Sequence, residues 1–224
     1  MLKLAFYGNP YIGIFARAND EFALIPEDSQ PKFEESLRER LKVDIVRTSI
    51  YDSSLIGLYC TMNNNGIITT HLAYNEELHR IRKETGLDIY VLKSKYTAVG
   101  NIMCCNDKGA VISKYIDTKT SKEIGEFLDV EVIRAKIAGY NTCGSACICT
   151  NKGFVVHNDV TDSEMDQLRD IFGVDGINST VNFGFEFPMY GIIANSKGYV
   201  VSENTTGIEV MRIDQGLGFS RRRI

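Results

Sequence analysis

The amino-acid sequence predicts an α/β protein in which five similar strand–strand–helix–strand units close into a ring. The first observation is a hairpin turn that recurs along the 224 residues. In its third copy apolar residues run up to Cys105, and Asn106 and Asp107 turn the backbone. We expect Gly109 to supply a positive φ there. The turns are marked by Glu21, Gly66, Gly109, Gly153 and Gly198, which are 45, 43, 44 and 45 residues apart. A fixed period of this length indicates a repeat architecture.

A second sequence marker keeps the same period. Each hairpin is followed by a helix-like stretch and then by a short run in which an acidic residue stands next to apolar ones. The acidic positions are Asp44, Asp88, Glu131 and Asp175, which are 44, 43 and 44 residues apart. Strand alternation predicts that these carboxylates face solvent; a metal-binding ring of carboxylates is the alternative.

The two ends of the chain indicate how the ring closes. A short apolar strand, residues 1–6, precedes the first hairpin, whereas the fifth unit lacks a good final strand. We therefore expect strand 1–6 to complete the fifth unit, which would remove exposed sheet edges. The predicted single domain covers residues 1–224, with repeats at about 7–47, 48–92, 93–135, 136–178 and 179–219. Residues 220–224 are expected to be a flexible basic tail, in which Arg221, Arg222 and Arg223 either contact RNA phosphates or are simply solvated.

The elements of the units follow from local patterns. The stretches 11–16, 55–60 and 98–105 are predicted as the first strands of their hairpins. Pro31 favours a helix start in the first unit, and Asn75 is a plausible N-cap in the second. Residues with capping-box spacing then predict the remaining three helix starts. These pairs are Thr120 with Glu123, Thr161 with Glu164, and Thr206 with Glu209.

Composition and charge limit the function classes. Lys and Arg number 25 and Asp and Glu 29, so the net charge of −4 argues against a general polyanion binder, although a local basic patch stays open. The sequence contains no signal-peptide pattern and no membrane-spanning stretch, which favours a cytoplasmic protein. Six cysteines are expected to be reduced and buried as small apolar side chains, with a metal site or a disulfide as the alternative. They are Cys60, Cys104, Cys105, Cys143, Cys147 and Cys149.

Five such units in a ring are typical of the pentein, or α/β-propeller, fold, and here a family resemblance becomes specific. Almost the whole chain, from about Leu4 to Gly218, resembles the archaeal translation initiation factor 6 family. The segments that carry the resemblance are 8–13, 75–82, 98–107, 128–132 and 204–209. Departures from the family pattern lie at Tyr51 and Asp52 and in the aromatic segment 181–190.

The resemblance implies a binding protein without chemistry of its own. Members of this family bind the large ribosomal subunit, where they contact ribosomal protein and neighbouring ribosomal RNA and block the small subunit; large-subunit maturation is a further implied role. A monomer is expected, with no cofactor, metal, membrane or small-molecule substrate. Asn101 corresponds to a family position at the ribosome-facing end of the ring, although hydrogen bonding within a turn is the plainer role for an asparagine. By pseudo-symmetry, the same end should hold Asn9, Tyr11, Ser53, Ser54, Tyr96 and Ser145.

Two other function classes stay open. Pentein folds also form guanidino-group-modifying enzymes, which use a cysteine nucleophile, a histidine and paired carboxylates, so fold alone does not decide. The histidines are His71, His79 and His157; His79 lies on a predicted helix, and the other two hold nearly equivalent repeat positions, which indicates a structural role. Cysteines such as Cys147 lie in predicted strands rather than in exposed loops beside a histidine, which disfavours an enzyme. A non-ribosomal scaffold is the third class.

Overall fold

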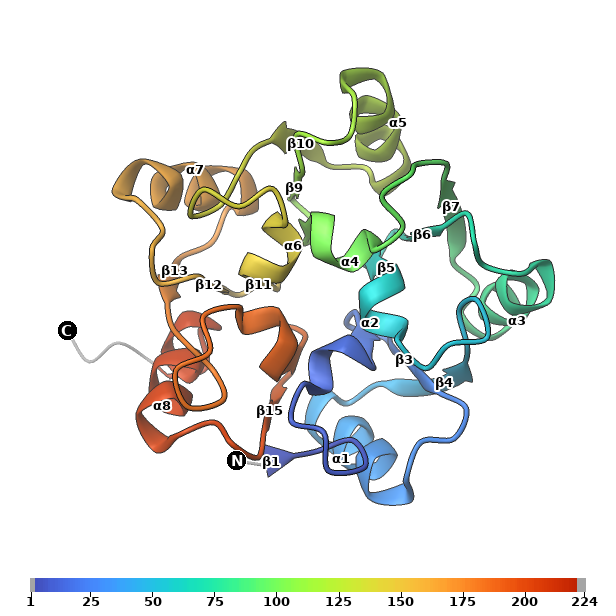
Figure 1. The fold of residues 1–224 in the computed structure, drawn as a ribbon, viewed down its shortest axis with the longest axis horizontal. Coiled ribbons are helices and arrows are strands. Elements are labelled where there is room, and N and C mark those ends of the chain that lie inside the picture. Colours follow the sequence, from blue (N-terminus) through green and yellow to red (C-terminus); the bar gives the residue numbers. More distant parts are fainter. Residues whose placement is uncertain (1–2, 221–224) are drawn as a thin grey trace.

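The computed structural model describes residues 3–220, which form five three-stranded sheets arranged in a ring around a central axis (Figure 1). In each sheet an inner strand runs antiparallel to a middle strand, and the middle strand pairs in parallel with an outer strand. The predicted pentein fold is therefore confirmed. Within residues 3–220 no helix is long and apolar enough to cross a membrane.

The strands fall into three classes by their distance from the axis. The inner strands are β2 (Arg17–Ala18), β5 (Cys60–Met62), β8 (Met103–Cys105), β11 (Cys147–Cys149) and β14 (Ile192–Ala194). The middle strands are β3 (Phe22–Pro26), β6 (Gly66–Thr70), β9 (Gly109–Ile112), β12 (Phe154–Val156) and β15 (Tyr199–Ser202). The outer strands are β4 (Asp44–Thr48), β7 (Asp88–Leu92), β10 (Glu131–Arg134), β13 (Gly176–Asn178) and β1 (Lys3–Leu4). Because β1 pairs in parallel with β15, the N-terminal part of the chain supplies the outer strand of the fifth sheet.

Four long helices join a middle strand to an outer strand, and a fifth follows the middle strand β15. They are α1 (Pro31–Leu41), α3 (Asn75–Thr85), α5 (Thr118–Leu128), α7 (Asp162–Phe172) and α8 (Gly207–Gly216). Each helix also packs against the preceding sheet: α1 contacts β15, and α7 contacts β9. The buried apolar side chains accordingly form clusters between neighbouring sheets, as Leu37 does with Ile193 and Val200. The repeats stabilise one another because none of them buries its apolar face alone.

The helix starts confirm three of the five predicted signals. Pro31 is the first residue of α1. The capping boxes of Thr161 with Glu164 and of Thr206 with Glu209 are both formed. These caps satisfy backbone N–H groups that have no partner inside the helix.

The other two predicted starts were wrong by one and three residues. Asn75 is already the first residue of α3, and the Glu77 carboxylate accepts the backbone N–H of Tyr74 at 2.8 Å. At α5 the N-cap is Asp117, whose carboxylate accepts the Thr120 N–H at 3.0 Å. An aspartate three residues upstream caps as well as a threonine does, so sequence spacing alone did not separate them.

The predicted first strands of the hairpins were largely wrong, because the chain forms single helical turns there. Residues 11–16 contain no strand, 55–60 contain only the first strand residue Cys60, and in 98–105 the strand begins at Met103. These turns are η1 (Ile12–Ile14), α2 (Ile56–Tyr59), α4 (Val99–Ile102), α6 (Cys143–Ala146) and η2 (Pro188–Gly191). They surround the axis at one end of the ring (Figure 1). A Cβ atom on Gly57 would lie 2.0 Å from the Gly13 carbonyl oxygen, and one on Gly100 would lie 2.0 Å from the Gly57 oxygen. Glycine is needed there because each turn packs its backbone directly on the next.

The hairpin turns lie at the opposite end of the ring, and their glycines were assigned the wrong role. Gly109 does not adopt a positive φ. Instead, a Cβ atom on it would lie 2.1 Å from the Ile171 carbonyl oxygen at the end of α7. Gly198 is restricted in the same way by the carbonyl oxygen of Arg40, at 1.9 Å. These glycines admit the end of a neighbouring helix.

The asparagines of the turns link successive repeats. The Asn63 side-chain amide donates to the Asn106 and Leu128 carbonyls, and its oxygen accepts the Asn65 and Gly66 N–H groups. Equivalent bonds start from Asn19, Asn106 and Asn195, while Thr150 replaces asparagine in the fourth repeat. The periodic asparagines thus serve the ring itself.

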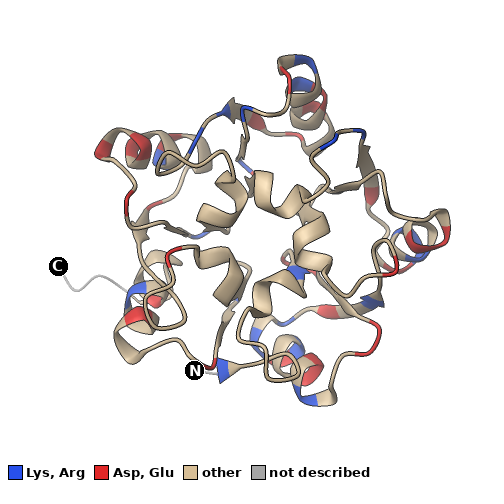
Figure 2. Cartoon of the chain, in the orientation of Figure 1, with Lys and Arg blue, Asp and Glu red and all other residues tan. Residues whose placement is uncertain are grey.

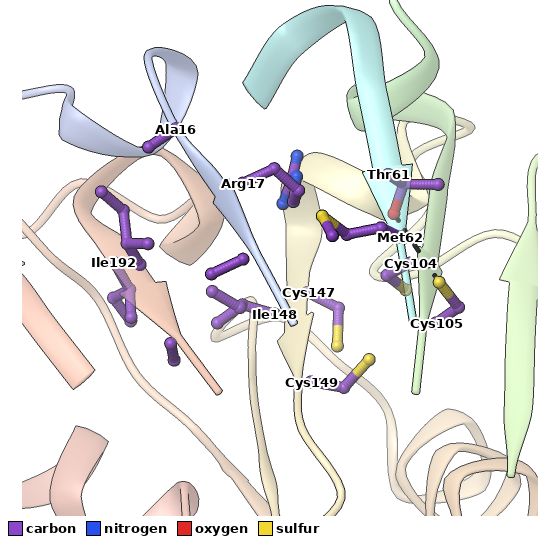
Figure 3. A pocket seen from close by; sticks show the side chains of 13 residues that line it. Ala16, Arg17, Thr61, Met62, Cys104, Cys105, Cys147, Ile148, Cys149 and Ile192 are labelled. Atoms are coloured by element: carbon purple, nitrogen blue, oxygen red, sulfur yellow. Dashed lines mark hydrogen bonds between the residues drawn. The ribbon is translucent and has the colours of Figure 1, made fainter. Parts of the chain in front are cut away.

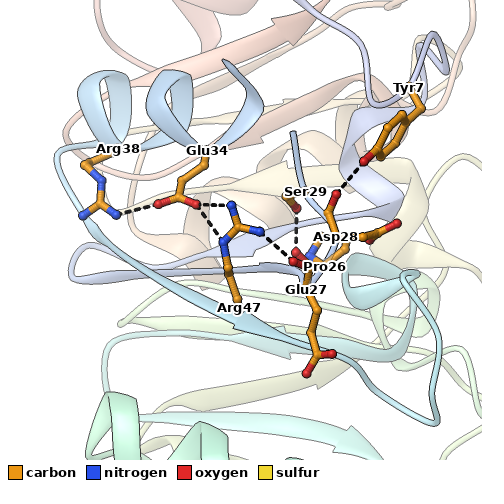
Figure 4. A network of polar contacts seen from close by, with 8 residues as sticks. All are labelled: Tyr7, Pro26, Glu27, Asp28, Ser29, Glu34, Arg38 and Arg47. Atoms are coloured by element: carbon orange, nitrogen blue, oxygen red, sulfur yellow. Dashed lines mark hydrogen bonds and ion pairs between the residues drawn. The ribbon is translucent and has the colours of Figure 1, made fainter. Parts of the chain in front are cut away.

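Several surface and core expectations are confirmed. Asp44, Asp88, Glu131 and Asp175 are all exposed. Five of the six cysteines are buried, as expected, while Cys149 is half-buried. At the edge of the first repeat, Glu34 binds Arg38 at 2.8 Å and Arg47 at 2.7 Å (Figure 4). The predicted basic tail, Arg221–Arg223, lies outside the described residues.

Candidate functional site

The predicted site residues lie at the end of the ring that carries the single helical turns, which we call the short-helix end. Asn9, Tyr11, Ser53, Ser54 and Tyr96 occupy loops that follow outer strands and lead into η1, α2 and α4. Asn101 is in α4 and Ser145 in α6, so both stand closer to the axis. The structure therefore gathers all seven residues on one end.

A ring of pseudo-equivalent side chains surrounds the axis at this end. Each is four residues before the last residue of an inner strand; the members are Ile14, Leu58, Asn101, Ser145 and Tyr190. The Tyr190 hydroxyl donates to Asn101 Oδ1 at 3.3 Å. Ser145 is buried, and its hydroxyl donates to the Thr142 carbonyl at 2.8 Å. Burial raises the pKa of Tyr190, whose hydroxyl also lies beside Ser145.

Asn9 and Ser53 have local structural roles. Asn9 Oδ1 accepts the Tyr11 N–H at 2.9 Å, and Ser53 Oγ accepts the Leu55 N–H at 3.2 Å. Ser94 does the same for the Tyr96 N–H at 3.1 Å. These side chains begin the turn that leads into each short helix, which is a common use of Asn and Ser.

A buried carboxylate holds the loop that contains Ser53 and Ser54. Tyr51 and Asp52 have φ values of 60° and 51°, which is unusual for residues other than glycine. Glu77 accepts the backbone N–H groups of both residues, at 2.8 and 3.0 Å. Glu209 holds the equivalent loop in the fifth repeat by accepting the Gly184 N–H at 2.8 Å. Tyr51 and Asp52, which depart from the family pattern, therefore form a tightly fixed turn.

Exposed aromatic side chains mark the short-helix end. Within residues 3–220 seven large aromatic side chains are exposed, and all of them lie on loops at this end. They are Tyr7, Tyr11, Tyr51, Tyr74, Tyr115, Tyr140 and Phe183. Phe183, at the tip of the aromatic segment 181–190, is 83% exposed. Aromatic residues are enriched in protein interfaces, and a surface that gathers them favours binding.

The aromatic segment 181–190 also packs across to the first and fourth repeats. Phe185 lies edge-on to Tyr11, with ring centroids 5.3 Å apart, and to Tyr190 at 5.7 Å. Phe187 lies edge-on to Tyr140 at 5.1 Å. The role of Tyr190 and these contacts are not apparent in the sequence, because they depend on how the repeats align in space.

His157 sits beside this cluster and is fully buried. Its Nδ1 accepts the Asp159 N–H at 3.1 Å, as Ser113 Oγ accepts the Tyr115 N–H in the third repeat. The predicted structural role of His157 is supported by this equivalence. Its Nε2 has no hydrogen bond and lies 3.7 Å from a carboxylate oxygen of Glu186.

The side chains of His157, Asp159 and Glu186 approach closely enough to consider a metal ion, with ligand atoms within 4.8 Å of one another. This group is not apparent from the order of residues in the sequence. An acceptor role for Nδ1 places the ring proton on Nε2, the atom that faces Glu186. The arrangement therefore favours an N–H group directed at a carboxylate over a metal ligand.

The ring also encloses a central cavity lined by Arg17 and by cysteines of the third and fourth repeats (Figure 3). The Arg17 guanidinium donates to the carbonyls of Gly57 and Cys60. Hydrogen bonds from the Cys147 and Cys149 thiols, together with the nearby Arg17 charge, lower the pKa of Cys104 to about 5. Burial raises the pKa of Cys147 well above its ordinary value.

Comparisons with known proteins agree with this architecture. Residues 1–216 match the model of the eIF-6 family. The chain is 42% identical over 222 residues to translation initiation factor 6 of Pyrococcus horikoshii, covering 97% of this chain and 98% of that protein. It is 41% identical over 207 residues to the factor of Thermoplasma acidophilum, covering 92% and 94%. For the factor of Methanosarcina mazei the identity is 37% over 213 residues, covering 95% and 96%.

One solved structure is more distantly similar. It is a crystal structure of dimethylarginine dimethylaminohydrolase as an adduct with S-methyl-L-thiocitrulline. The TM-score is 0.46 at 11% identity, with 93% of this chain and 74% of that chain covered, and no functional conclusion follows from so low a score. The match to the family model and the identities to its members decide the family: this chain belongs to the eIF-6 family of translation initiation factors.

Proposed function

We propose that this protein binds the large ribosomal subunit through its short-helix end and prevents the small subunit from joining. It acts in the cytoplasm as a monomer, without a cofactor and without catalysis, and it also assists large-subunit maturation. The observation that carries the proposal is membership of the eIF-6 family, combined with the gathering of exposed aromatic side chains on one end of the ring.

The two ends of the ring differ in what they offer a partner. At the hairpin end, side chains such as those of Asn63 and Asn106 are engaged with neighbouring repeats. At the short-helix end, Tyr11 and Phe183 are exposed and Asn101 is half-buried. The net charge of −4 means that docking relies on local complementarity rather than on general attraction to RNA.

A guanidino-modifying enzyme is the alternative that the pentein fold brings with it. Cys147 is 1% exposed and His157 is 0% exposed, and burial raises the pKa of the Cys147 thiol. A nucleophilic cysteine needs the opposite, a reachable thiolate next to its base. The positions of these residues therefore support a binding protein.

Sedimentation of the purified protein with separated large or small subunits from an archaeal relative tests the proposal. The wild type should travel with the large subunit alone. Asn101→Ser should weaken that binding about tenfold, as expected for a contact at the centre of an interface. Its unfolding temperature should fall by about 4 °C at most, because the substitution removes one long hydrogen bond from Tyr190.

The control is Asp88→Ala, which changes an exposed side chain at the hairpin end. This variant should bind the large subunit as the wild type does. Equal binding by Asn101→Ser and the wild type would remove Asn101 from the interface, and a protein that stays at the top of the gradient at low salt would contradict the proposed function.

A further inference from the structure

The five repeats serve as internal controls for one another, and the third differs from the rest at the short-helix end. Each repeat has one loop residue at an equivalent position just beyond its middle strand. This residue directly follows Pro26, Thr70, Ser113, His157 or Ser202. In repeat order these residues are Glu27, His71, Lys114, Asn158 and Glu203. Only the third repeat has a lysine at this position of the described chain.

Further positive charges gather around Lys114. Lys93 and Lys95 lie on the loop that leads into α4, and Lys136 follows β10; all four lysines are exposed. The loops are tied together, because Arg134 at the end of β10 donates to the Lys114 carbonyl at 3.1 Å. Figure 2 shows Lys and Arg along the loops next to α5 and β10.

Two tyrosines stack between these lysines. The rings of Tyr96 and Tyr115 lie 4.4 Å apart at an interplanar angle of 7°, and Tyr115 is 47% exposed. The Lys95 ammonium lies 5.2 Å from the centre of the Tyr96 ring. The other aromatic pairs recorded in the described chain are tilted or edge-on, apart from the stacked and buried pair of Phe6 and Phe15. The pair is flat, Tyr115 is exposed and Tyr96 is half-buried, so the pair offers a stacking surface for a planar group on the side of Tyr115.

We infer that these residues form an RNA-binding platform, in which an unpaired base stacks on the tyrosine pair while the lysines contact the phosphates on either side. The platform consists of Lys93, Lys95, Tyr96, Lys114, Tyr115 and Lys136. This inference rests on the proposed function, in which the short-helix end faces the ribosome, and it assigns the RNA contact to the third repeat.

The chemistry favours RNA over an acidic peptide. Stacked aromatic rings with separated point charges are the combination that binds single-stranded nucleic acid. A carboxylate-rich peptide is better matched by arginine forks, and the Arg134 guanidinium is engaged with Lys114 and Thr118. The nearby Asp117 carboxylate accepts from the Thr120 N–H and hydroxyl groups, so it is occupied as the cap of α5.

Salt-dependent binding of a fluorescent single-stranded RNA of about 12 nucleotides tests the inference, with fluorescence anisotropy as the readout. The triple variant Lys93→Gln, Lys95→Gln and Lys114→Gln should reduce the slope of log K against log salt by about 2, since each lost phosphate contact in single strands is worth about 0.7. The matched control changes the exposed lysines Lys32, Lys83 and Lys122 of the outer helices to glutamine, and it should leave the slope unchanged.

Substitutions in the tyrosine pair should affect RNA binding differently from substitutions of the lysines. Tyr115→Ala should weaken RNA binding about tenfold without changing the salt slope, and Tyr115→Trp should restore the affinity. The platform would be overturned if the two triple variants lost the same amount of the slope of log K against log salt. It would also be overturned if a poly-glutamate peptide bound more tightly than RNA.

Sedimentation separates the platform from the proposed function. If the platform is right, the lysine triple variant loses affinity for the large subunit and that loss grows as salt is lowered. An RNA-binding platform in a protein that never binds large subunits would contradict the proposed function alone. A triple variant that loses RNA binding but binds large subunits like the wild type would show that the platform does not serve the docking site.

Discussion

Replacing Glu77 by glutamine should destabilise the protein far more than a surface substitution does. One carboxylate oxygen accepts from the Ser49 hydroxyl at 2.6 Å and the Asp52 N–H at 3.0 Å. The other accepts the Tyr51 and Tyr74 N–H groups, both at 2.8 Å. Glutamine keeps one oxygen and turns an NH₂ group toward donors. Because a hydrogen bond to a charged group contributes about 1.5–3 kcal/mol, we expect a loss of about 3 kcal/mol.

Thermal and chemical unfolding measure this effect. For a chain of this size a loss of about 3 kcal/mol corresponds to an unfolding temperature lower by about 9 °C. Glu76→Gln is the matched control, since Glu76 is the exposed neighbour in the same helix, and it should change the stability by less than about 0.5 kcal/mol. If the two variants unfold alike, Glu77 does not hold the loop of Tyr51 and Asp52.

The same carboxylate makes a prediction about pH. Burial alone would raise the pKa of Glu77, but hydrogen bonds from Ser49 and from the N–H groups of Tyr74, Asp52 and Tyr51 outweigh it and hold the pKa below its ordinary value of 4.5. A lowered pKa in the folded state stabilises the protein above about pH 4.5, and this contribution disappears as the pH falls through the folded value. The stability gap between the wild type and Glu77→Gln should therefore narrow on acidification; a gap that widens would refute the reasoning.

Two further predictions concern the packing of the ring. Gly57→Ala should prevent normal folding, or cost more than about 3 kcal/mol, because its Cβ would lie 2.0 Å from a backbone oxygen. A Cβ atom on Gly207 in α8 would meet open space, so Gly207→Ala should stabilise the protein by about 0.5–1 kcal/mol in the same denaturation assay. Equal changes in stability for the Gly57 and Gly207 variants would contradict this description of the packing. Asn106→Ala should cost about 2–4 kcal/mol through its lost amide bonds, whereas Asn106→Thr should cost less, because Thr150 fills the equivalent position. Similar losses for the alanine and threonine variants would mean that the side-chain acceptor is unimportant.

The repeat period predicted the ring because it is a long-range property written directly in the sequence. The asparagines and glycines of the hairpin turns recur every 43 to 45 residues because each one contacts the next repeat. The physical role of Gly109 could not be obtained in this way, since the turn itself does not need a positive φ. The helix end that approaches Gly109 belongs to another repeat and is invisible in the local sequence.

The short helices were missed for a similar reason. Stretches such as Val99–Ile102 are mostly apolar and only four residues long, so their local pattern resembles a strand. Backbone packing between successive glycines, such as Gly57 and Gly100, decides in favour of a helical turn. Local preference is weak in so short a segment, and tertiary contacts override it.

The candidate site was predictable only as a location. Pseudo-symmetry placed Asn9, Ser53 and Asn101 at one end, and the structure gathers them there. The sequence did not reveal that Asn9 and Ser53 bind their own backbone, or that the Tyr190 hydroxyl reaches Asn101. Partners from different repeats meet only after the ring has closed, and those contacts decide which side chains stay free for a partner.

Subunit joining, followed by light scattering or by sedimentation, tests the central proposal most directly. Large subunits from an archaeal relative are first mixed with an equal amount of this protein, and small subunits are added afterwards. We predict that joined ribosomes do not form and that the protein remains with the large subunit. Joining at the rate and extent seen without the protein, while the protein is bound to the large subunit, would contradict the proposed function.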